Sequence, residues 1–194
     1  AGAIYLLPAP MNTAGTRPRD GRALAISADG MVVVGAQDPS SSGGTDVPDP
    51  DGSRPIVYRW NPATSQYDLW SYLPDGVQAS GNPIGGFGDG FFINAAGTII
   101  VGKSRESLTG TAFITKWTWN VGTSTWDRTM IASGLSNPAP SWLPSGATFN
   151  NLFITGMSDD GNTIVGDVMW QFGTFIHSGF IWTVGDNLVE DWYD

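Results

Sequence analysis

Short apolar runs separated by glycine turns set the hydrophobic pattern of this chain. Residues 24–28 and 31–34 are such runs, and between them lies Asp29-Gly30, a dipeptide that favours a tight turn because glycine takes positive φ without a Cβ clash. The second run is continuously apolar, which is typical of a strand buried on both faces. Apolar and polar residues then alternate over residues 56–60, the period-two pattern of a strand with one face inward.

No helix is predicted, because no window of about eleven residues keeps apolar positions at helical spacing. The chain has 26 glycines and 13 prolines, and only 14% of its 194 residues are charged. Helical proteins rely instead on Glu, Lys, Ala and Leu. Residues 38–54, 81–90 and 133–141 are rich in Gly, Ser, Pro or Asp and are expected to be loops. We therefore expect an all-β protein.

One block of sequence occurs three times. It consists of a small polar residue, a turn that ends in glycine, a run of four residues rich in Val and Ile, and a second glycine. Three such blocks at nearly even spacing indicate divergent copies of one unit rather than chance. The blocks are residues 25–35, 92–102 and 156–166, with turn glycines Gly30, Gly97 and Gly161.

Two further motifs accompany each block, a Leu-Pro pair before it and an aromatic strand after it. The aromatic strands match Trp60, Trp119 and Trp182 to one position, where we expect packing in the core or between units. Each copy is predicted to be an antiparallel four-stranded unit, and the three units form a single domain, 1–194. The units are about residues 6–71, 72–141 and 142–194, and the Leu-Pro pairs are Leu7-Pro8, Leu73-Pro74 and Leu143-Pro144.

The repeated block resembles the extracellular HAF-repeat family of bacterial surface proteins and autotransporter passengers. That family's unit has a Leu-Pro start, a Ser-x-Asp-Gly-x-x-Val-Val-Gly core and an aromatic-x-Trp strand. Residues 27–35 and 158–166 keep the core best, whereas the second copy departs at Asn94, Ala95 and Ala96, and the His-Ala-Phe element is replaced in all three copies. The resemblance implies a propeller-like β fold and an extracellular location, and it implies no activity.

Three units are too few for a closed propeller, which typically has four to eight blades. An open array of sheets leaves unpaired edges that can pair with another chain. Residues 3–7 look like a surplus N-terminal strand, since they align with residues 69–73, the last strand of the first copy. We expect homo-oligomers formed by strand addition through the sheet edges, as a ring or a filament. The strand-exchange candidates are Ile4, Tyr5, Leu6 and Leu7.

The charge and the residue types that are missing exclude several partners. A formal net charge of −9 disfavours nucleic acid and anionic membrane surfaces, both of which attract clustered Lys and Arg. No apolar run approaches the roughly 18 residues that would insert in a membrane. The absence of cysteine excludes disulfides and thiolate metal sites. With a start at Ala1-Gly2-Ala3 that would suit a mature terminus, these features favour a secreted or bacterial cell-surface protein.

Candidate residues for catalysis are few. His177 is the one histidine, Glu106 and Glu190 are the two glutamates, and the Gly-x-Ser-x-Gly sequence of serine hydrolases is missing. A paired-carboxylate glycosidase is the best enzymatic alternative, but turn chemistry explains the repeated aspartates. We therefore predict a non-enzymatic protein without a cofactor.

Two binding sites are predicted as alternatives to a purely structural role. The acidic loop with Asp46, Asp49 and Asp51 has the oxygen-rich composition that suits Ca²⁺, although a solvated acidic loop would look the same. The non-recurring Trp142, together with Asn150 and Asn151, could stack on and hydrogen-bond a sugar. The sequence thus favours a structural protein that self-associates, with a lectin-like glycan-binding module as the alternative.

Overall fold

The computed structural model describes seven segments of the chain and places β-strands in most of them. No helix occurs in the described residues, so none there is long and apolar enough to cross a membrane. The prediction of an all-β protein is confirmed. The described segments are residues 4–9, 20–38, 54–74, 91–105, 112–132, 144–184 and 190–192.

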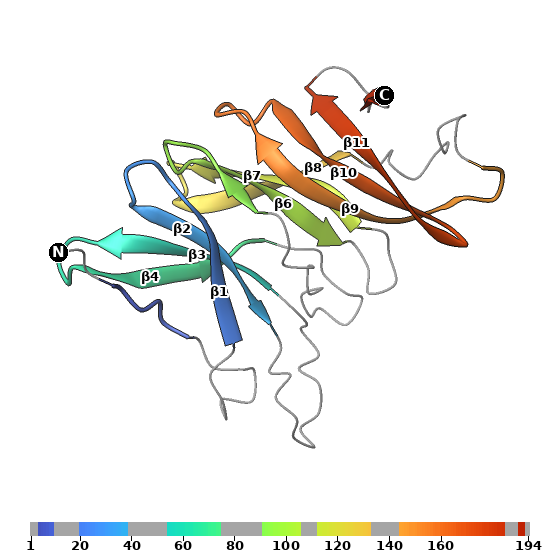
Figure 1. Cartoon of the computed structure of the whole chain (residues 1–194). Coiled ribbons are helices and arrows are strands. Elements are labelled where there is room, and N and C mark those ends of the chain that lie inside the picture. Colours follow the sequence, from blue (N-terminus) through green and yellow to red (C-terminus); the bar gives the residue numbers. More distant parts are fainter. Residues whose placement is uncertain are drawn as a thin grey trace, which may run out of the picture.

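The strands form three antiparallel sheets, each with four strands in consecutive order (Figure 1). Sheet 1 consists of β1 (Asp20–Ile26), β2 (Val32–Asp38), β3 (Arg54–Asn61) and β4 (Gln66–Tyr72). Sheet 2 consists of β5 (Phe92–Ile93), β6 (Ile99–Arg105), β7 (Ala112–Asn120) and β8 (Thr125–Ala132). Sheet 3 consists of β9 (Thr148–Met157), β10 (Thr163–Phe172), β11 (Thr174–Thr183) and β12 (Glu190–Trp192). The three sheets follow one another in chain order, and the described strands form no closed barrel or propeller.

The turn glycines adopt the backbone conformation that their sequence context predicts. Gly30, Gly97 and Gly161 have φ values of 72°, 68° and 66°, a region that side chains with a Cβ rarely adopt. Each of these glycines donates its N–H to the carbonyl oxygen three residues earlier, over 2.9 to 3.0 Å. The turns also touch one another, because Ala28 N–H donates to Ala95 O (3.1 Å) and Ala95 N–H donates to Asp159 Oδ1 (2.6 Å). The turns therefore tie the three sheets together at one end.

The hydrophobic core lies between the sheets, in two clusters. The front face of sheet 1, which is the face toward sheet 2, packs against the back of sheet 2, and the front of sheet 2 packs against the back of sheet 3. The continuously apolar strand β2 is buried on both faces, as the sequence predicts. The first cluster is Val32, Val34, Ala36, Val57, Leu73, Phe91, Ile100, Trp117 and Trp126. The second is Val101, Ile114, Leu152, Ile154, Ile164, Val168, Trp170, Phe180 and Trp182.

The strand register corrects the predicted equivalence of three tryptophans. Trp182 pairs with the second residue of β10, and Trp117 and Tyr58 pair with the second residues of β6 and β2. Trp182 therefore corresponds to Trp117 and Tyr58, and all three side chains are buried. Trp60 and Trp119 lie two residues further along their strands and are only partly buried. The alignment of Trp182 with Trp60 and Trp119 was wrong because the third aromatic motif is too short to fix the alignment. The register is set by backbone pairing, which a short sequence motif does not show.

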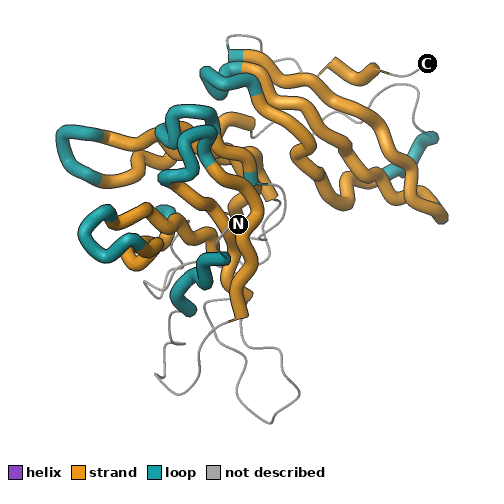
Figure 2. Tube along the Cα trace, turned by 60° about the vertical axis from the view of Figure 1, so that its left-hand side comes forward, coloured by secondary structure: helices purple, strands orange, loops and turns teal. Residues whose placement is uncertain are grey.

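The predicted surplus N-terminal strand is wrong for the described residues 4–9. These residues belong to no sheet, and Figure 2 draws them as loop beside sheet 1. Their side chains pack on the outer face of sheet 1, the face away from sheet 2, in a small cluster around Val33, Ile56 and Tyr58. No described strand pairs with the backbone of this segment. The segment is held by side-chain packing and by a hydrogen bond from Tyr58 Oη to Pro8 O.

Candidate functional site

The N-terminal segment 4–9 presents its side chains alternately to sheet 1 and to solvent. The Tyr5 ring lies 5.3 Å from the Trp60 ring, centroid to centroid, in an edge-to-face arrangement, and Leu7 packs against the outer-face cluster. Ile4 and Leu6 point away from the sheet and are 93% and 90% exposed. Two aliphatic side chains this exposed are unusual next to each other in a segment held against a sheet.

This segment lies on sheet 1 in the way that the end of β4 lies on sheet 2. Tyr58 Oη donates a hydrogen bond to Pro8 O (3.1 Å), and the corresponding Trp117 Nε1 donates to Pro74 O (2.6 Å). The leucine before each proline is packed in the adjacent cluster, Leu7 on sheet 1 and Leu73 on sheet 2. Residues 4–8 thus occupy on sheet 1 the place that the end of β4 occupies on sheet 2, but they belong to none of the described sheets.

An apolar cavity of about 400 Å³ lies between the N-terminal segment and sheet 1. Ile26, Leu24 and Trp70 are exposed on or beside the same outer face. The outer face of sheet 1 is therefore apolar, and among the described residues the N-terminal segment covers only part of it. The cavity is lined by Tyr5, Leu7, Ala23, Leu24, Ala25, Ile26, Val33 and Tyr67.

At the other end of the array, the described part of the last strand of sheet 3 is short. β12 has three described residues, against seven in β4 and eight in β8, and these three pair with β11 at Gly179, Phe180 and Ile181. Part of the β11 edge is therefore not covered by the described strand. Two aromatic side chains, Phe172 and Phe175, are exposed at the hairpin between β10 and β11.

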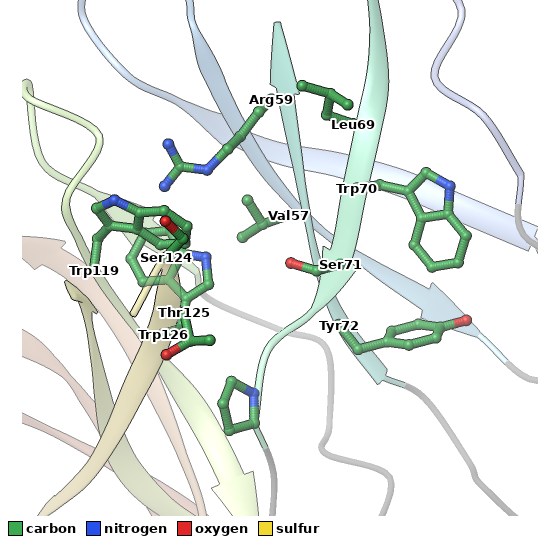
Figure 3. Close-up of a pocket in the computed structure, with 11 residues that line it drawn as sticks. Val57, Arg59, Leu69, Trp70, Ser71, Tyr72, Trp119, Ser124, Thr125 and Trp126 are labelled. Atoms are coloured by element: carbon green, nitrogen blue, oxygen red, sulfur yellow. The ribbon is translucent and has the colours of Figure 1, made fainter. Parts of the chain in front are cut away.

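A second candidate site is a groove between sheets 1 and 2, with a volume of about 290 Å³ (Figure 3). Arg59 of β3 enters it from one sheet, and Trp119 and Trp126 of β7 and β8 enter it from the other. Ser71 points into the groove from β4, whereas its neighbours Trp70 and Tyr72 point to the opposite side of that strand. The full lining is Val57, Arg59, Leu69, Trp70, Ser71, Tyr72, Pro74, Trp119, Ser124, Thr125 and Trp126.

The groove contains a cation that has no described acceptor for one of its nitrogens. The Arg59 guanidinium carbon lies 3.7 Å from the centre of the Trp119 ring and 5.5 Å from that of Trp126, which are cation–π distances. Burial lowers the pKa of Arg59 from its usual value, because it removes water from the charged form. Within the described residues, Arg59 Nη2 and the buried Trp126 Nε1 have no hydrogen-bond partner. Both atoms are donors, and no described acceptor of the groove pairs with either of them.

The sites that the sequence predicts fall mostly outside the described residues. Asp46, Asp49, Asp51 and Trp142 lie there, and Asn150 and Asn151 belong to β9 without a described side-chain placement. The calcium and glycan sites at these residues stay predictions. In the described part of the chain, no three His, Cys, Asp or Glu side chains are grouped as metal ligands. The described His177 lies on sheet 3, where its Nδ1 is 2.6 Å from Asp167 Oδ2.

Sequence reasoning missed the Arg59 groove. Arg59 stands between two aromatic residues of β3, and nothing in that local pattern marks it as a binding residue. Its ring partners are some sixty residues away and meet it only because sheet 1 stacks on sheet 2. The one available signal is that an arginine stands where the strand register places threonines, Thr118 and Thr183, in the other aromatic strands.

Comparison with known proteins assigns no family to this chain. No family model matches it, and no curated protein matches it. The geometry of its own residues is therefore the basis for a function.

Proposed function

We propose that the protein is a non-enzymatic structural module of the cell exterior that self-associates by strand addition. The observation that carries the proposal is the position of residues 4–8. They contact sheet 1 through Leu7 and Pro8 as the end of β4 contacts sheet 2, yet their backbone belongs to no sheet. A segment placed as a last strand without its sheet is suited to complete the sheet of another copy.

Sheet 3 of a neighbouring copy is the sheet that fits. In the described residues, its β11 edge carries the three-residue strand β12, and we propose that residues 4–7 pair beside it or in its place. The front of sheet 3 would then pack on the outer face of sheet 1, which repeats the front-to-back stacking already present inside the molecule. Such an interface joins two different surfaces, and it produces a ring if the rotation closes or a filament if it does not.

The energetics require more than the two exposed aliphatic side chains. Burying Ile4 and Leu6 contributes about 1.5–3 kcal/mol each. Association of two chains costs about 4–15 kcal/mol in lost freedom. The added strand's hydrogen bonds, at about 0.5–1.5 kcal/mol each, and burial of the exposed Ile26 and Trp70 must supply the difference. The interface is therefore proposed to include the outer face of sheet 1 as well as the segment.

We also propose that the protein is extracellular and that its sheets are ordered as in a propeller. The resemblance of residues 27–35 and 158–166 to HAF repeats supports this, as does the acidic, cysteine-free composition. We propose that the three sheets correspond to part of a propeller, and that further copies of the chain add their own sheets to it.

Substitution of the two exposed aliphatic residues tests the proposal. The double variant Ile4→Lys/Leu6→Lys places charges where strand addition would bury side chains, and we expect it to sediment as a monomer at concentrations where the wild type forms oligomers. The matched control is Val121→Lys, which changes an 80% exposed residue in the turn between β7 and β8 and should leave the oligomers intact. A wild-type protein that stays monomeric at every concentration would refute self-association.

A further inference from the structure

We propose that the groove between sheets 1 and 2 binds an acidic saccharide, whose carboxylate pairs with Arg59. This site is separate from the outer face of sheet 1 and does not depend on self-association. It also differs from the glycan site that the sequence predicts around Trp142.

The case for a carboxylate begins with the unpaired donors. Arg59 Nη2 and Trp126 Nε1 are both shielded from solvent and lack a described acceptor. A buried donor without a partner costs about 1–3 kcal/mol, and more when the group is charged. Natural proteins rarely leave such groups unpaired, and those that remain usually have a functional reason. A carboxylate bound in the groove would offer oxygen acceptors to these donors.

The lining of the groove favours a sugar as the carrier of that carboxylate. Ser71, Ser124 and Thr125 supply hydroxyl groups around the groove, and Trp126 and Leu69 supply apolar surface. Hydroxyls suit the many hydroxyls of a saccharide, and indole and aliphatic surface suits its C–H face. The volume of about 290 Å³ lies at the small end of the range for small-molecule sites, roughly 300–1,000 Å³, which fits one or two sugar rings.

The sheet framework does not require an arginine at this position. Arg59 pairs with the first residue of β2, and the residue that pairs with the first residue of β6 is Thr118. Sheets 2 and 3 therefore stack without an arginine at the corresponding place. The interface between sheets 2 and 3 has its own cations, Lys103 and Lys116, but their ammonium groups donate to carbonyl oxygens of Leu152, Asp160 and Gly161. Arg59 differs from them because its Nη2 has no described acceptor, which favours a ligand at this place.

The test is a nuclear magnetic resonance titration that follows the indole N–H signal of Trp126. The probe is glucuronic acid, with glucose and glutarate as controls, and the protein carries Ile4→Lys/Leu6→Lys so that self-association does not interfere. We expect glucuronic acid to shift the Trp126 signal in a saturable way, and glucose and glutarate to bind at least 10-fold more weakly. Equal binding of glucose would overturn the role of the carboxylate, and equal binding of glutarate would overturn the saccharide.

Substitution of the arginine gives the second readout. Arg59→Gln should reduce the affinity for glucuronic acid at least 10-fold, and Arg22→Gln, which removes an arginine from exposed β1, should not. Unchanged affinity in Arg59→Gln would refute the proposal. If Arg59→Gln does not fold, the titration of the protein with Arg59 intact decides alone, and absence of a Trp126 shift there refutes the site.

Discussion

At the residue scale, the side-chain oxygen of Asn94 accepts two backbone hydrogen bonds in the second turn. In the other turns, two separate residues accept the corresponding bonds. In the first turn, Ser27 Oγ and Asp29 Oδ1 each accept a hydrogen bond from a backbone N–H at the start of the following strand. In the second turn, Asn94 Oδ1 accepts from both Thr98 N (2.8 Å) and Ile99 N (2.9 Å). The departure of the second copy from the shared motif is therefore compensated within the turn, by the same kind of contact.

This compensation predicts a rescue between positions 94 and 96. Asn94→Ser alone should lower the free energy of unfolding by about 1–2 kcal/mol, because serine accepts only one of the two backbone bonds. Adding Ala96→Asp rebuilds the serine–aspartate pair of the first turn and should restore most of the loss. Urea unfolding of the single and double variants measures both effects. A double variant no more stable than Asn94→Ser would contradict the shared role.

The turn aspartates predict how stability responds to acid. The hydrogen bond from Ser158 Oγ and then that from the Asn162 N–H lower the pKa of Asp160 below its usual value of 3.8, and Ser27 and Met31 do the same for Asp29. A carboxylate whose folded pKa is depressed contributes stability above the unfolded pKa, and this contribution is lost as the pH falls through the folded pKa.

Asp160→Asn should therefore weaken the dependence of stability on pH in acid. We expect the free energy of unfolding of the wild type to decline as the pH falls below 3.8, and the decline to be shallower in Asp160→Asn and shallowest in the variant that also carries Asp29→Asn. Urea unfolding at a series of acidic pH values measures the slopes. Identical slopes in all three proteins would show that these turns do not contribute.

At the element scale, the sequence predicts the strands well wherever the signal is local. The turn glycines, the apolar run of β2 and the alternation in β3 each lie within a few residues, and the structure places a strand at each run. The two predictions that were wrong concern features that depend on pairing with another strand. Residues 4–7 have the composition of a strand, but a strand exists only where another offers its backbone. The register of Trp182 likewise depends on pairing with β10.

The second glycine of each block has a steric reason that a single substitution tests. A Cβ at Gly166 would overlap the carbonyl oxygen of Phe153 and the ring of Phe180, so Gly166→Ala should cost about 1–3 kcal/mol or more. Gly179 lies on the neighbouring strand β11, and the nearest atom to its added Cβ is at 3.9 Å. Gly179→Ala should change stability by less than about 0.5 kcal/mol. Thermal unfolding of the two variants compares them, and similar losses would contradict the steric account.

At the scale of the whole molecule, neither candidate site could be read from the sequence in full. The N-terminal segment carries its own signal, and the exposure of Ile4 and Leu6 agrees with their choice as strand-exchange candidates, although exchange itself stays a prediction. The Arg59 groove carries no such signal, because it forms only when Trp119 and Trp126 of one sheet meet the arginine of another. Sites between stacked sheets depend on tertiary packing, and short motifs do not encode them.

The stack of sheets also explains why assembly is expected at its ends. Two internal interfaces bury the front of one sheet against the back of the next. Among the described residues, the same geometry leaves a back face at sheet 1, which residues 4–9 cover in part, and a front face at sheet 3. Copies that join these two faces would continue the front-to-back stacking of sheets from one molecule to the next. The N-terminal segment would be the strand that connects them.

Hydrogen exchange of the backbone amides of residues 4–7 tests strand addition most directly. In a monomer these amides are unpaired with any strand and should exchange quickly, and they should slow at least 10-fold as the protein concentration rises and oligomers form. The Ile4→Lys/Leu6→Lys variant should remain fast throughout. If the wild-type amides exchange equally fast in monomer and oligomer, the segment does not become a strand, and the account of this protein as a strand-adding module is wrong.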